Sequence, residues 1–585
     1  MDSINSFKGY GKVDELEERA FRRKTRKRII ILVVSSIVLL AVVVGAVVGV
    51  VVKNNNNSKS YSGPATISDS LKAVCSSTQY PDSCYSSIAS LEASNNITQD
   101  PELIFKLSLQ VAINELTKIH DYPTKLMDQT NDEQVKAALN VCRTVFDDAL
   151  DHLNDSMSSM QQGEKLLSPS KIDDIKTWLS SSITDQQTCL DSFEELELNS
   201  TNSRVYSDIE TAMKNSTEFA SNCLAIGTKI MGLLSQFDIP LHRRLLGLDH
   251  QGSSDFPRWV GPGERRLLQE VKPTPDAVVA QDGSGDCKTI KEAVDKVPKK
   301  SDKRFVIHIK SGTYNENVIL DKSKWNVMMY GDGKTVTIIS GDKNFGVDKI
   351  PTFDTATVAV AGRGFIAKDI KFINTAGAEK HQAVAFRSGS DRSVFYQCTF
   401  DAFQDTLYAH SNRQFYRDCD ITGTIDFIFG NAAVVFQNCN IMPRQPLSNQ
   451  FNTITAQGKK DPNQNTGISI QNCKFSALET SLSAPTYLGR PWKDYSTTII
   501  MQSAIGSFLN PLGWKEWVSN VDPPKTIFYA EYQNTGPGSD VSNRVKWAGY
   551  KPTLTVDEAA KFTVKSLIQG TDWLPATSVA FQESL

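Results

Sequence analysis

The stretch that decides the fold is Ser393-Val-Phe-Tyr-Gln-Cys398-Thr-Phe400, a short apolar strand that runs into a cysteine. The same pattern recurs three times, at Arg413-Gln-Phe-Tyr-Arg-Asp-Cys419-Asp-Ile421, Val434-Val-Phe-Gln-Asn-Cys439-Asn-Ile441 and Ile468-Ser-Ile-Gln-Asn-Cys473-Lys-Phe475. The first three cysteines are 21 and 20 residues apart, and the fourth follows after 34, so the last interval contains an insertion. Repeats of about twenty residues with one strand each are typical of a solenoid. The Leu/Asn consensus of leucine-rich repeats is absent, so residues 269–585 are predicted to form an all-β right-handed parallel β-helix.

The repeat also places these cysteines at equivalent positions of successive coils. Equivalent positions in successive coils stack about 4.8 Å apart, and disulfide Cα separations begin at about 4.4 Å. We therefore predict a disulfide between Cys419 and Cys439. On spacing alone a bridge between Cys398 and Cys419 is nearly as compatible, and an unbridged column of buried thiols is the third alternative.

The N-terminal segment predicts a membrane anchor. Residues 29–52 contain no charged residue and are long enough to span a hydrocarbon core of roughly 30 Å. Six basic residues lie within 22–28, which predicts that residues 1–28 stay cytoplasmic and that the chain after the anchor is exported. Residues 53–64 are polar and Asn/Ser-rich, as in a linker. Five glycosylation sequons follow, at Asn56, Asn96, Asn154, Asn199 and Asn215.

Residues 65–235 have apolar side chains at helical spacing and few prolines, which predicts an all-α four-helix bundle. This region contains Cys75, Cys84, Cys142, Cys189 and Cys223. In an oxidising compartment five cysteines allow at most two disulfides. We predict Cys75–Cys84, because it closes the shortest loop, and then Cys142–Cys189.

Residues 236–268 are a candidate processing linker. Two Arg-Arg-Leu-Leu motifs are separated by Gly, Pro and Ser, and they comprise Arg243, Arg244, Leu245, Leu246, Arg265, Arg266, Leu267 and Leu268. A repeated dibasic motif in a loop-like stretch favours cleavage by a processing protease. The alternative is a solvated basic linker. The net charge also divides here: residues 53–268 carry 19 Lys and Arg against 29 Asp and Glu, a net charge of −10.

The coil period brings four polar residues of the predicted β-helix together. Gln382, Gln404 and Asp426 are spaced by 22 and 22 residues, and Asp405 lies 21 residues before Asp426. Two aspartates one strand apart cannot both ionise freely, so one is expected to be an acid and the other a carboxylate. The glutamine amides can donate to a developing oxyanion. The structural alternative is an aspartate ladder that caps the turns of the β-helix.

Other chemistries have little support in the sequence. There is no Gly-x-Ser-x-Gly elbow, and His308, His381 and His410 lack the spacing of metal ligands. The C-terminal cysteines lack zinc-type pairs, and Lys and Arg are dispersed. We therefore expect no cofactor, no metal and no nucleic-acid partner.

Five segments of the C-terminal half, in this order, resemble the signature segments of plant pectinesterases. They are Gly312-Thr-Tyr314-Asn-Glu316, Gln382-Ala-Val-Ala, Gln404-Asp405-Thr-Leu-Tyr408, Asp426-Phe-Ile-Phe-Gly430 and Leu488-Gly-Arg490-Pro-Trp492. The resemblance covers essentially all of residues 270–585. Residues 65–235 resemble the pectin methylesterase inhibitor fold that precedes many such enzymes as a pro region.

The resemblance implies a role for each matching residue. Asp426 matches the nucleophile, Asp405 the proton donor that later acts as base, Gln382 and Gln404 the oxyanion donors, and Arg490 the residue that orients the nucleophile. The substrate-contact positions are Thr352, Gln382, Tyr408, Phe429, Arg490, Trp492 and Trp514. Carboxylate attack on an ester is covalent catalysis, and a second group that alternates as acid and base suits its two steps.

The expected activity is hydrolysis of pectin methyl esters to pectate and methanol, in modification of the plant cell wall. The expected partners are methylated homogalacturonan, a subtilisin-like processing protease, the chain's own inhibitor-like region and separate inhibitor proteins. The expected location is a secretory membrane for the precursor and the cell wall for the mature enzyme, with the bundle restraining the enzyme until cleavage. Two alternatives stay open: a β-helix glycosidase or lyase acting on the same polymer, and a non-enzymatic inhibitor or wall-binding protein that acts through its bundle.

Overall fold

The structure is a computed structural model that describes residues 67–92, 101–161, 169–198, 204–236 and 273–585. Residues 67–585 form one compact unit. The predicted tail, anchor and both linkers, with the two Arg-Arg-Leu-Leu motifs, lie outside the described residues, as do Asn56, Asn96 and Asn199. Among the described helices, none is both long and apolar enough to cross a membrane.

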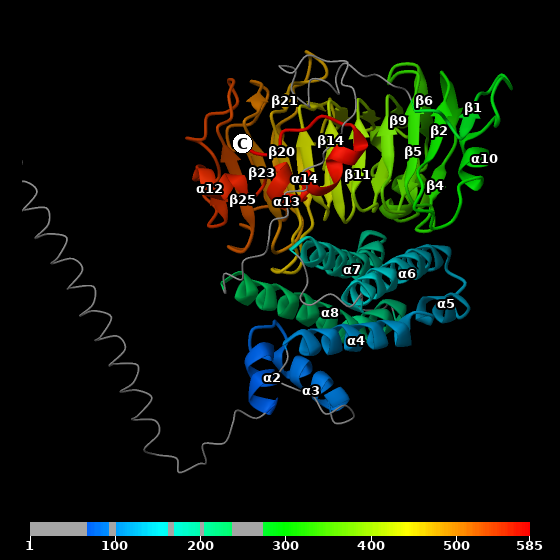
Figure 1. Cartoon of the computed structure of the whole chain (residues 1–585). Helices are drawn as coiled ribbons and strands as arrows, with labels where there is room; N and C mark the ends of the chain where they lie inside the picture. The colour runs from blue at the N-terminus through cyan, green and yellow to red at the C-terminus, as the bar shows by residue number, and fades with distance from the viewer. Residues whose placement is uncertain (1–66, 93–100, 162–168, 199–203, 237–272) are drawn as a thin grey trace, which may run out of the picture. The chain divides into compact units, whose positions relative to one another are not determined.

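The C-terminal part is a parallel β-helix, as the repeat predicts. Its strands belong to three sheets of eleven, seven and eight strands, and the chain visits the sheets in turn on each coil. Every strand pairs in parallel with its equivalent one coil away; for example, Phe395 of β11 aligns with Tyr416 of β14, and Tyr416 aligns with Phe436 of β17. Figure 1 shows the successive coils stacked along the axis of the β-helix.

The strand bounds of each sheet follow in spatial order. The eleven-stranded sheet contains β1 (Ala277–Val279), β2 (Phe305–Ile309), β5 (Val327–Gly331), β8 (Ile366–Lys368), β11 (Ser393–Tyr396), β14 (Arg413–Arg417), β17 (Ala433–Gln437), β20 (Gly467–Gln471), β23 (Thr497–Met501), β25 (Phe528–Tyr532) and β26 (Tyr550–Lys551). The seven-stranded sheet contains β22 (Thr486–Pro491), β19 (Asn452–Gln457), β16 (Ile428–Gly430), β13 (Leu407–Ala409), β10 (Phe386–Ser388), β7 (Val358–Val360) and β4 (Val318–Leu320). The eight-stranded sheet contains β24 (Ala504–Ile505), β21 (Lys474–Phe475), β18 (Asn440–Pro443), β15 (Asp420–Gly423), β12 (Thr399–Asp401), β9 (Lys371–Asn374), β6 (Thr337–Gly341) and β3 (Gly312–Asn315).

Short helices complete the C-terminal part: α10 (Ile290–Asp295), α11 (Phe345–Asp348), η1 (Thr352–Thr355), η2 (Ala378–Lys380), α12 (Val556–Ala560), α13 (Val564–Leu567), α14 (Gly570–Trp573) and η3 (Leu574–Thr577). Inside the coils, aromatic side chains stack along the axis. The rings of Phe395 and Tyr416 lie 4.4 Å apart, and those of Tyr416 and Phe436 lie 4.5 Å apart. This ladder fills the interior and fixes the coil register, because a slip of one residue would turn it out of the core.

The predicted disulfide between Cys419 and Cys439 is wrong: both residues are buried free thiols, as are Cys398 and Cys473. Each thiol instead donates to a carbonyl of its own coil, such as Cys419 Sγ to Arg417 O at 3.4 Å. In-register neighbours on parallel coils carry Cα–Cβ bonds that point the same way. The Cys419 side chain also contacts those of Cys398 and Cys439 on the neighbouring coils, so the thiols pack against one another without a covalent bond. The unbridged column is therefore the arrangement found.

The N-terminal part is all α-helical. Its helices are α2 (Ile67–Cys75), α3 (Pro81–Glu92), α4 (Pro101–Ile119), α5 (Tyr122–Met127), α6 (Glu133–Gln161), α7 (Pro169–Glu195) and α8 (Arg204–Gln236). The four long helices α4, α6, α7 and α8 pack on one another around an apolar core. Of the predicted sequons, Asn154 of α6 and Asn215 of α8 are described, and both are exposed.

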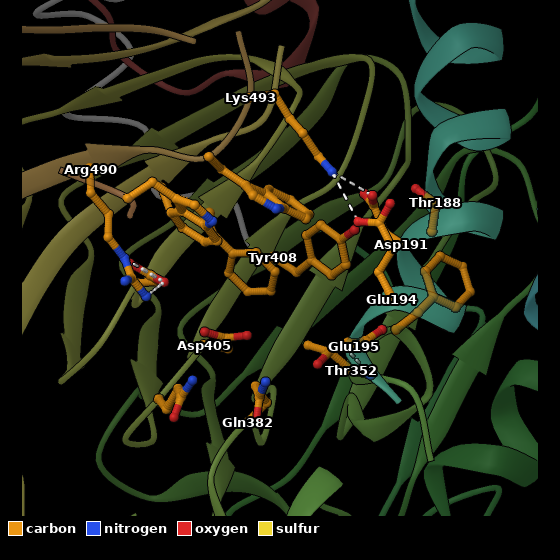
Figure 2. A pocket seen from close by; sticks show the side chains of 17 residues that line it. Thr188, Asp191, Glu194, Glu195, Thr352, Gln382, Asp405, Tyr408, Arg490 and Lys493 are labelled. Atoms are coloured by element: carbon orange, nitrogen blue, oxygen red, sulfur yellow. Dashed lines mark hydrogen bonds and ion pairs between the residues drawn. The ribbon is translucent and has the colours of Figure 1, made fainter. Parts of the chain in front are cut away.

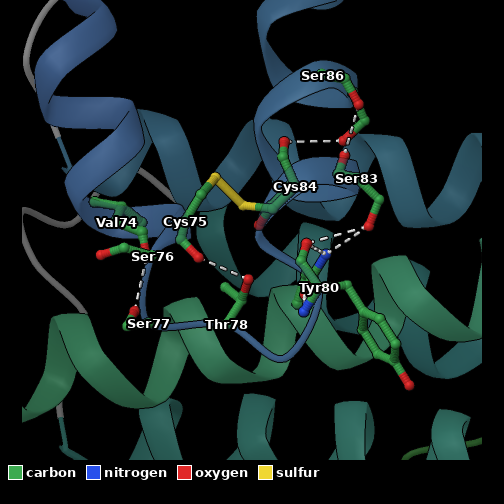
Figure 3. Close-up of a disulfide and its surroundings, with 12 residues drawn as sticks. Val74, Cys75, Ser76, Ser77, Thr78, Tyr80, Ser83, Cys84 and Ser86 are labelled. Carbon is green, nitrogen blue, oxygen red and sulfur yellow. Dashed lines mark hydrogen bonds between the residues drawn. A yellow bond between two sulfur atoms is a disulfide. The ribbon is translucent and has the colours of Figure 1, made fainter.

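Two disulfides connect this part, at the positions predicted. Cys75 joins Cys84 across the turn between α2 and α3, and Cys142 of α6 joins Cys189 of α7. Figure 3 shows the first bridge and the turn beneath it, where the Thr78 hydroxyl donates to Cys75 O at 2.8 Å. Cys223 is a buried free thiol. The longer loop closed by Cys142–Cys189 ties α6 to α7, the helix that reaches the candidate site.

Candidate active site

Two aspartates occupy equivalent positions on adjacent coils. Leu407 of β13 aligns with Ile428 of β16, and Asp405 and Asp426 each lie two residues before these aligned positions. Both have left-handed backbone conformations, with φ of 63° and 51°. Aspartate tolerates this conformation at a tight turn better than most residues do. The two carboxyl groups are therefore one strand spacing apart on the same face of the β-helix, as the 21-residue interval predicts.

Asp426 accepts hydrogen bonds from two neighbouring side chains. Arg490 of β22 donates through Nε to Oδ1 at 2.9 Å and through Nη2 to Oδ2 at 2.6 Å. The Thr453 hydroxyl of β19 donates to Oδ1 at 2.6 Å and accepts from the Asp426 backbone N–H at 3.0 Å. A two-point arginine contact is a strong, directional interaction that favours the ionised carboxylate.

Asp405 has the opposite electrostatic environment. Burial raises the pKa of its carboxyl well above the usual value of 3.8, and the neighbouring carboxyl groups of Asp426 and Glu195 raise the pKa further, against the lowering effect of Arg490. Two carboxyl groups this close are expected to have different pKa values. The pair thus combines an Asp426 that is bound by Arg490 with an Asp405 whose environment favours the protonated carboxyl.

Two glutamines complete the polar floor of the pocket. Gln404 directly precedes Asp405, and Gln382 precedes β10 on the coil before. Both side chains line the same cavity as the two aspartates and are partly exposed to it. Figure 2 shows Gln382 and Asp405 facing the cavity from neighbouring coils. Their amide N–H groups are suited to hydrogen-bond an oxygen on which negative charge develops.

The β-helix does contain a ladder of turn residues, but in another column. Six polar or acidic residues with φ between 52° and 58° stack at the turn after the eleven-stranded sheet: Asp369, Gln397, Asp418, Asn438, Asn472 and Gln502. Their backbones cap one coil on the next, as in the 3.0 Å bond from Gln397 N–H to Arg417 O. The structural role of an aspartate ladder is thus filled by a different set, and Asp405 and Asp426 lie on the face that carries the cavity.

An aromatic wall lines one side of the cavity. Tyr408 and Phe429 are stacked at 4.2 Å between ring centroids, and Trp492 lies 6.3 Å from Phe429. Trp517 continues this wall at 6.3 Å from Trp492, and the Arg490 guanidinium lies 4.2 Å from the centre of its ring. Flat apolar faces of this kind suit the C–H faces of sugar rings.

The prediction that Trp514 lines the groove is wrong. Its side chain is fully buried, and its indole N–H donates to Glu531 at 3.3 Å. Trp514 pairs in a parallel bridge with Gly489, which directs its side chain into the core of the last coils. Trp517, three residues later, lies at the cavity in its place and is 39% exposed.

The cavity, of about 490 Å³, is also lined by one helix of the N-terminal part. Thr188, Asp191, Glu194 and Glu195 of α7 reach it. Figure 2 shows these side chains opposite Tyr408 and Lys493, with α7 running alongside. The Thr352 backbone N–H donates to Glu195 Oε2 at 3.1 Å, and burial raises the pKa of Glu195 to about 8. The predicted contact position Thr352 is therefore in the cavity, where it holds a side chain of α7.

Several residues of the site were not predicted: Thr453, Lys493, Trp517 and the acidic residues of α7. Thr453 follows Asp426 by 27 residues because a loop enlarges that coil, so the coil period does not point to it. Lys493 directly follows the predicted Arg490-Pro-Trp492 segment, which is the signal that could have found it. Among the described residues, no group of three or more His, Cys, Asp or Glu side chains could hold a metal ion.

Comparison with known proteins agrees with this geometry. The family model described as Pectinesterase matches residues 276–571, and the model described as plant invertase/pectin methylesterase inhibitor matches residues 69–226. The chain is 64% identical to pectinesterase 1 of Arabidopsis thaliana and 62% identical to pectinesterase 3 of Phaseolus vulgaris, in each case over the full length of both chains. The solved structure of pectin methylesterase from carrot is similar with a TM-score of 0.52 and 53% identity, and it covers 54% of this chain and 100% of its own.

Proposed function

This chain belongs to the pectinesterase family and is a pectin methylesterase with an inhibitor-like N-terminal region, and on that premise we propose that Asp426 is the nucleophile and Asp405 the acid and base of the reaction. The observation that carries the proposal is the pair itself. Asp426 and Asp405 lie in register on adjacent coils. Arg490 and Thr453 contact the first, and burial next to Asp426 raises the pKa of the second.

In the first step, Asp426 Oδ attacks the carbonyl carbon of the methyl ester. The carbonyl oxygen becomes an oxyanion that accepts hydrogen bonds from the side-chain amides of Gln382 and Gln404. Asp405 gives its proton to the departing methoxy oxygen as the C–O bond breaks. Methanol leaves, and the Asp426 carboxyl is now joined to the galacturonate carbonyl carbon in an acyl anhydride.

In the second step, Asp405 is a carboxylate and takes a proton from water. The water oxygen attacks the galacturonate carbonyl carbon, and the two glutamines again contact the oxyanion. The bond to Asp426 breaks, Arg490 holds the returning carboxylate, and Asp405 has regained its proton. The raised pKa of Asp405 suits this alternation, since a group that both gives and takes a proton works best with a pKa near the working pH.

We further propose that the helical region restrains the enzyme by occupying its groove. Support comes from α7, whose residues line the catalytic cavity. Polar contacts hold α7 along the seven-stranded sheet: Ser181 to Asn412 at 2.8 Å, Thr184 to Asn431 at 2.8 Å, Thr188 to His410 at 2.9 Å and Asp191 to Lys493 at 2.6 Å. A pectin chain and α7 cannot fill the same cavity, so cleavage in 236–268 and release of the helices would open it.

We propose export through a membrane-anchored precursor and release into the cell wall by a protease acting in the 236–268 linker. Support comes from the uncharged residues 29–52 behind a basic segment. The disulfides of the helical region, Cys75–Cys84 and Cys142–Cys189, fit an oxidising compartment.

The test is methanol release from highly methylated pectin by residues 269–585. The carrot protein, whose whole chain is matched by 54% of this one, supports folding of the catalytic part without the helices. We expect Asp426→Asn to reduce the rate by at least about 10³-fold, since the nucleophile is lost. The matched control is Asp418→Asn, which makes the same change at a left-handed turn of the structural ladder and is expected to keep the rate.

Two outcomes would reject the proposal. If Asp426→Asn releases methanol as fast as the Asp418→Asn control, Asp426 is not the nucleophile. If the folded wild-type part shortens pectin or leaves unsaturated chain ends without releasing methanol, the activity is that of a hydrolase or lyase.

A further inference from the structure

A buried ion pair lies inside the last coils of the β-helix, and the proposed reaction does not use it. Glu531 of β25 accepts from Arg544 Nε at 2.8 Å and from Arg544 Nη2 at 3.0 Å, and both side chains are only 2% exposed. The Tyr550 hydroxyl and the Trp514 indole N–H also donate to Glu531, at 2.9 and 3.3 Å. A buried ion pair often stabilises a fold no more than apolar side chains of the same volume would. The distinctive effect of this pair is the placement of the groups that it contacts.

The pair fixes one backbone segment, residues 509–515, in the connection between β24 and β25. Arg544 Nη1 donates to Pro511 O at 3.1 Å, and Glu531 holds the Trp514 indole. Gly513 has a φ of 71°, and a Cβ atom at this position would lie 2.2 Å from Arg544 Cδ. The arginine side chain therefore packs directly against the backbone of the 509–515 segment.

The 509–515 segment lies along β22, the terminal strand of the seven-stranded sheet. The Leu488 N–H donates to Gly513 O at 2.7 Å, and the Lys515 N–H donates to Gly489 O at 3.0 Å. Arg490 follows directly after Gly489, and β19 pairs with the other edge of β22. The segment therefore supports the outer edge of β22 at the residues just before Arg490.

Arg490 depends on this support because its guanidinium matches a carboxylate at two points. Its Nε and Nη2 donate to Asp426 at 2.9 and 2.6 Å. The same connection carries Trp517, whose ring centre lies 4.2 Å from the guanidinium. A planar fork binds both oxygens only in a narrow range of orientations, and a catalytic site has to be held within about 0.5 Å of its productive geometry. A small shift of the 509–515 segment would therefore turn Arg490 away from the nucleophile.

We propose that Glu531 and Arg544 are positioning residues of the reaction, which act through the 509–515 segment on Arg490 and through Arg490 on Asp426. The proposal rests on the function given above, in which Asp426 attacks the ester and Arg490 orients it. Neither Glu531 nor Arg544 is among the described residues that line the catalytic cavity, so the pair acts without touching the substrate. It supports the nucleophile from the interior of the β-helix.

A double-mutant cycle separates positioning from plain structural support. In residues 269–585, Glu531→Gln keeps the shape of the side chain but removes its charge and one of the two oxygens that the guanidinium contacts. We expect kcat for methanol release to decrease about tenfold in the wild-type background and less than about twofold when Arg490→Lys is present, because coupled residues have non-additive effects. Lysine has no planar fork to be oriented. Equal decreases in the two backgrounds would overturn the proposal.

A second variant distinguishes positioning from loss of folding. Glu531→Leu with Arg544→Met replaces the pair by apolar side chains, an exchange that buried ion pairs commonly tolerate, and removes the side-chain bonds to the 509–515 segment. We expect a melting temperature near that of the wild type and a kcat about tenfold lower. The matched control is Asp391→Leu with Arg413→Met. It makes the same exchange at another buried pair, with bonds of 2.9 and 2.6 Å, and should retain kcat.

The outcomes separate this proposal from the esterase function. An unchanged kcat in the folded apolar variant, or an equal loss in its control, would overturn the positioning role and leave the esterase proposal standing. Failure of the apolar variant to fold would assign the pair to the stability of the fold and would also count against the positioning role. Absence of methanol with wild-type residues 269–585 would instead reject the esterase proposal.

Discussion

Glu195 of α7 accepts a hydrogen bond from the backbone N–H of Thr352 inside the cavity that contains Asp405. Burial raises the pKa of this glutamate from its ordinary 4.5 to about 8, and the nearby carboxylates of Asp191 and Asp354 also raise it. The contact is therefore made by a carboxylic acid over most of the physiological pH range. A neutral Glu195 can lie beside Asp405, whose own pKa is raised. If both groups were ionised, their negative charges would repel each other.

The contact predicts that restraint by the helices weakens as the pH rises. With α7 in place the pKa of Glu195 is raised above that of the free helix. Its contribution to the closed state is therefore complete below about pH 4.5 and is lost as the pH rises through about 8. We expect the methanol rate of residues 67–585, divided by that of residues 269–585, to increase by about tenfold or more between pH 6 and pH 9, since one pKa unit corresponds to a factor of about ten.

Glu195→Gln is the matched variant for this prediction. An amide keeps the acceptor for the Thr352 N–H and carries no charge at any pH. The ratio of rates should then change less with pH than in the wild type. A ratio that increases equally in both would assign the pH dependence to other groups where the two parts meet, such as His152 and Asp185 of the helical part, which contact Asn412 and His410 of the β-helix.

The hydrogen bonds between Thr453 and Asp426 predict that a substitution of Thr453 reduces both activity and stability. Thr453→Val removes the hydroxyl that both donates to Asp426 Oδ1 and accepts from the Asp426 N–H. We expect kcat to decrease by about tenfold to a hundredfold and the free energy of unfolding to decrease by about 1–3 kcal/mol, because a buried N–H loses its acceptor. Thr453→Ser keeps the hydroxyl and should retain most of the activity; if it is as slow as Thr453→Val, the methyl group and not the hydrogen bond matters.

The parts of this molecule that repeat could be predicted from the sequence, and the parts that depend on side-chain direction could not. The coil period predicts that Asp405 and Asp426 are neighbours on adjacent coils. In parallel strands paired in register, two residues separated by one coil length in the sequence lie side by side in space. The same period suggested a Cys419–Cys439 bridge, which is not formed: stacking brings the two thiols close together, but closeness in one column does not decide whether they are joined covalently.

Two further features depend on tertiary contacts that a single sequence does not encode locally. Trp514 and Trp517 lie in one loop-rich segment, and the bridge of Trp514 to Gly489 decides which of them is buried. The approach of Asp191 to Lys493 joins residues from the two different parts of the chain. Helical spacing predicts α7, but it does not predict which face of α7 meets the groove.

Trp517 and Trp514 give a contrasting pair of predictions. Trp517→Ala should raise KM for pectin with little change in thermal stability, because this side chain lines the cavity and is partly exposed. Trp514→Ala should destabilise the fold by about 3–5 kcal/mol, as expected for a large buried aromatic residue. Thermal unfolding and steady-state kinetics on both variants measure this contrast; equal stability losses would contradict it.

The free cysteine column predicts a thiol count. All ten cysteines of the chain are described; four form disulfides and six are free: Cys223, Cys287, Cys398, Cys419, Cys439 and Cys473. Alkylation after unfolding without reductant, followed by mass spectrometry, should label these six and leave Cys75, Cys84, Cys142 and Cys189 unlabelled. Protection of Cys419 and Cys439 would restore the disulfide predicted from the coil spacing.

We expect that Asp405, which the proposed reaction needs, lowers the stability of the fold at high pH. Asp405→Asn can neither give nor take a proton, so kcat should decrease by about 10²–10⁴-fold. The raised pKa has a further consequence with a definite sign: the folded state binds the Asp405 proton more tightly than the unfolded chain does, so stability is lost as the pH rises from about 3.8 through the folded pKa. Asparagine does not titrate, so the Asp405→Asn variant does not lose this stability as the pH rises. The variant should therefore melt at a higher temperature than the wild type at pH 8, and the difference should disappear near pH 3; a variant less stable at pH 8 would mean that Asp405 supports the fold as well as the reaction.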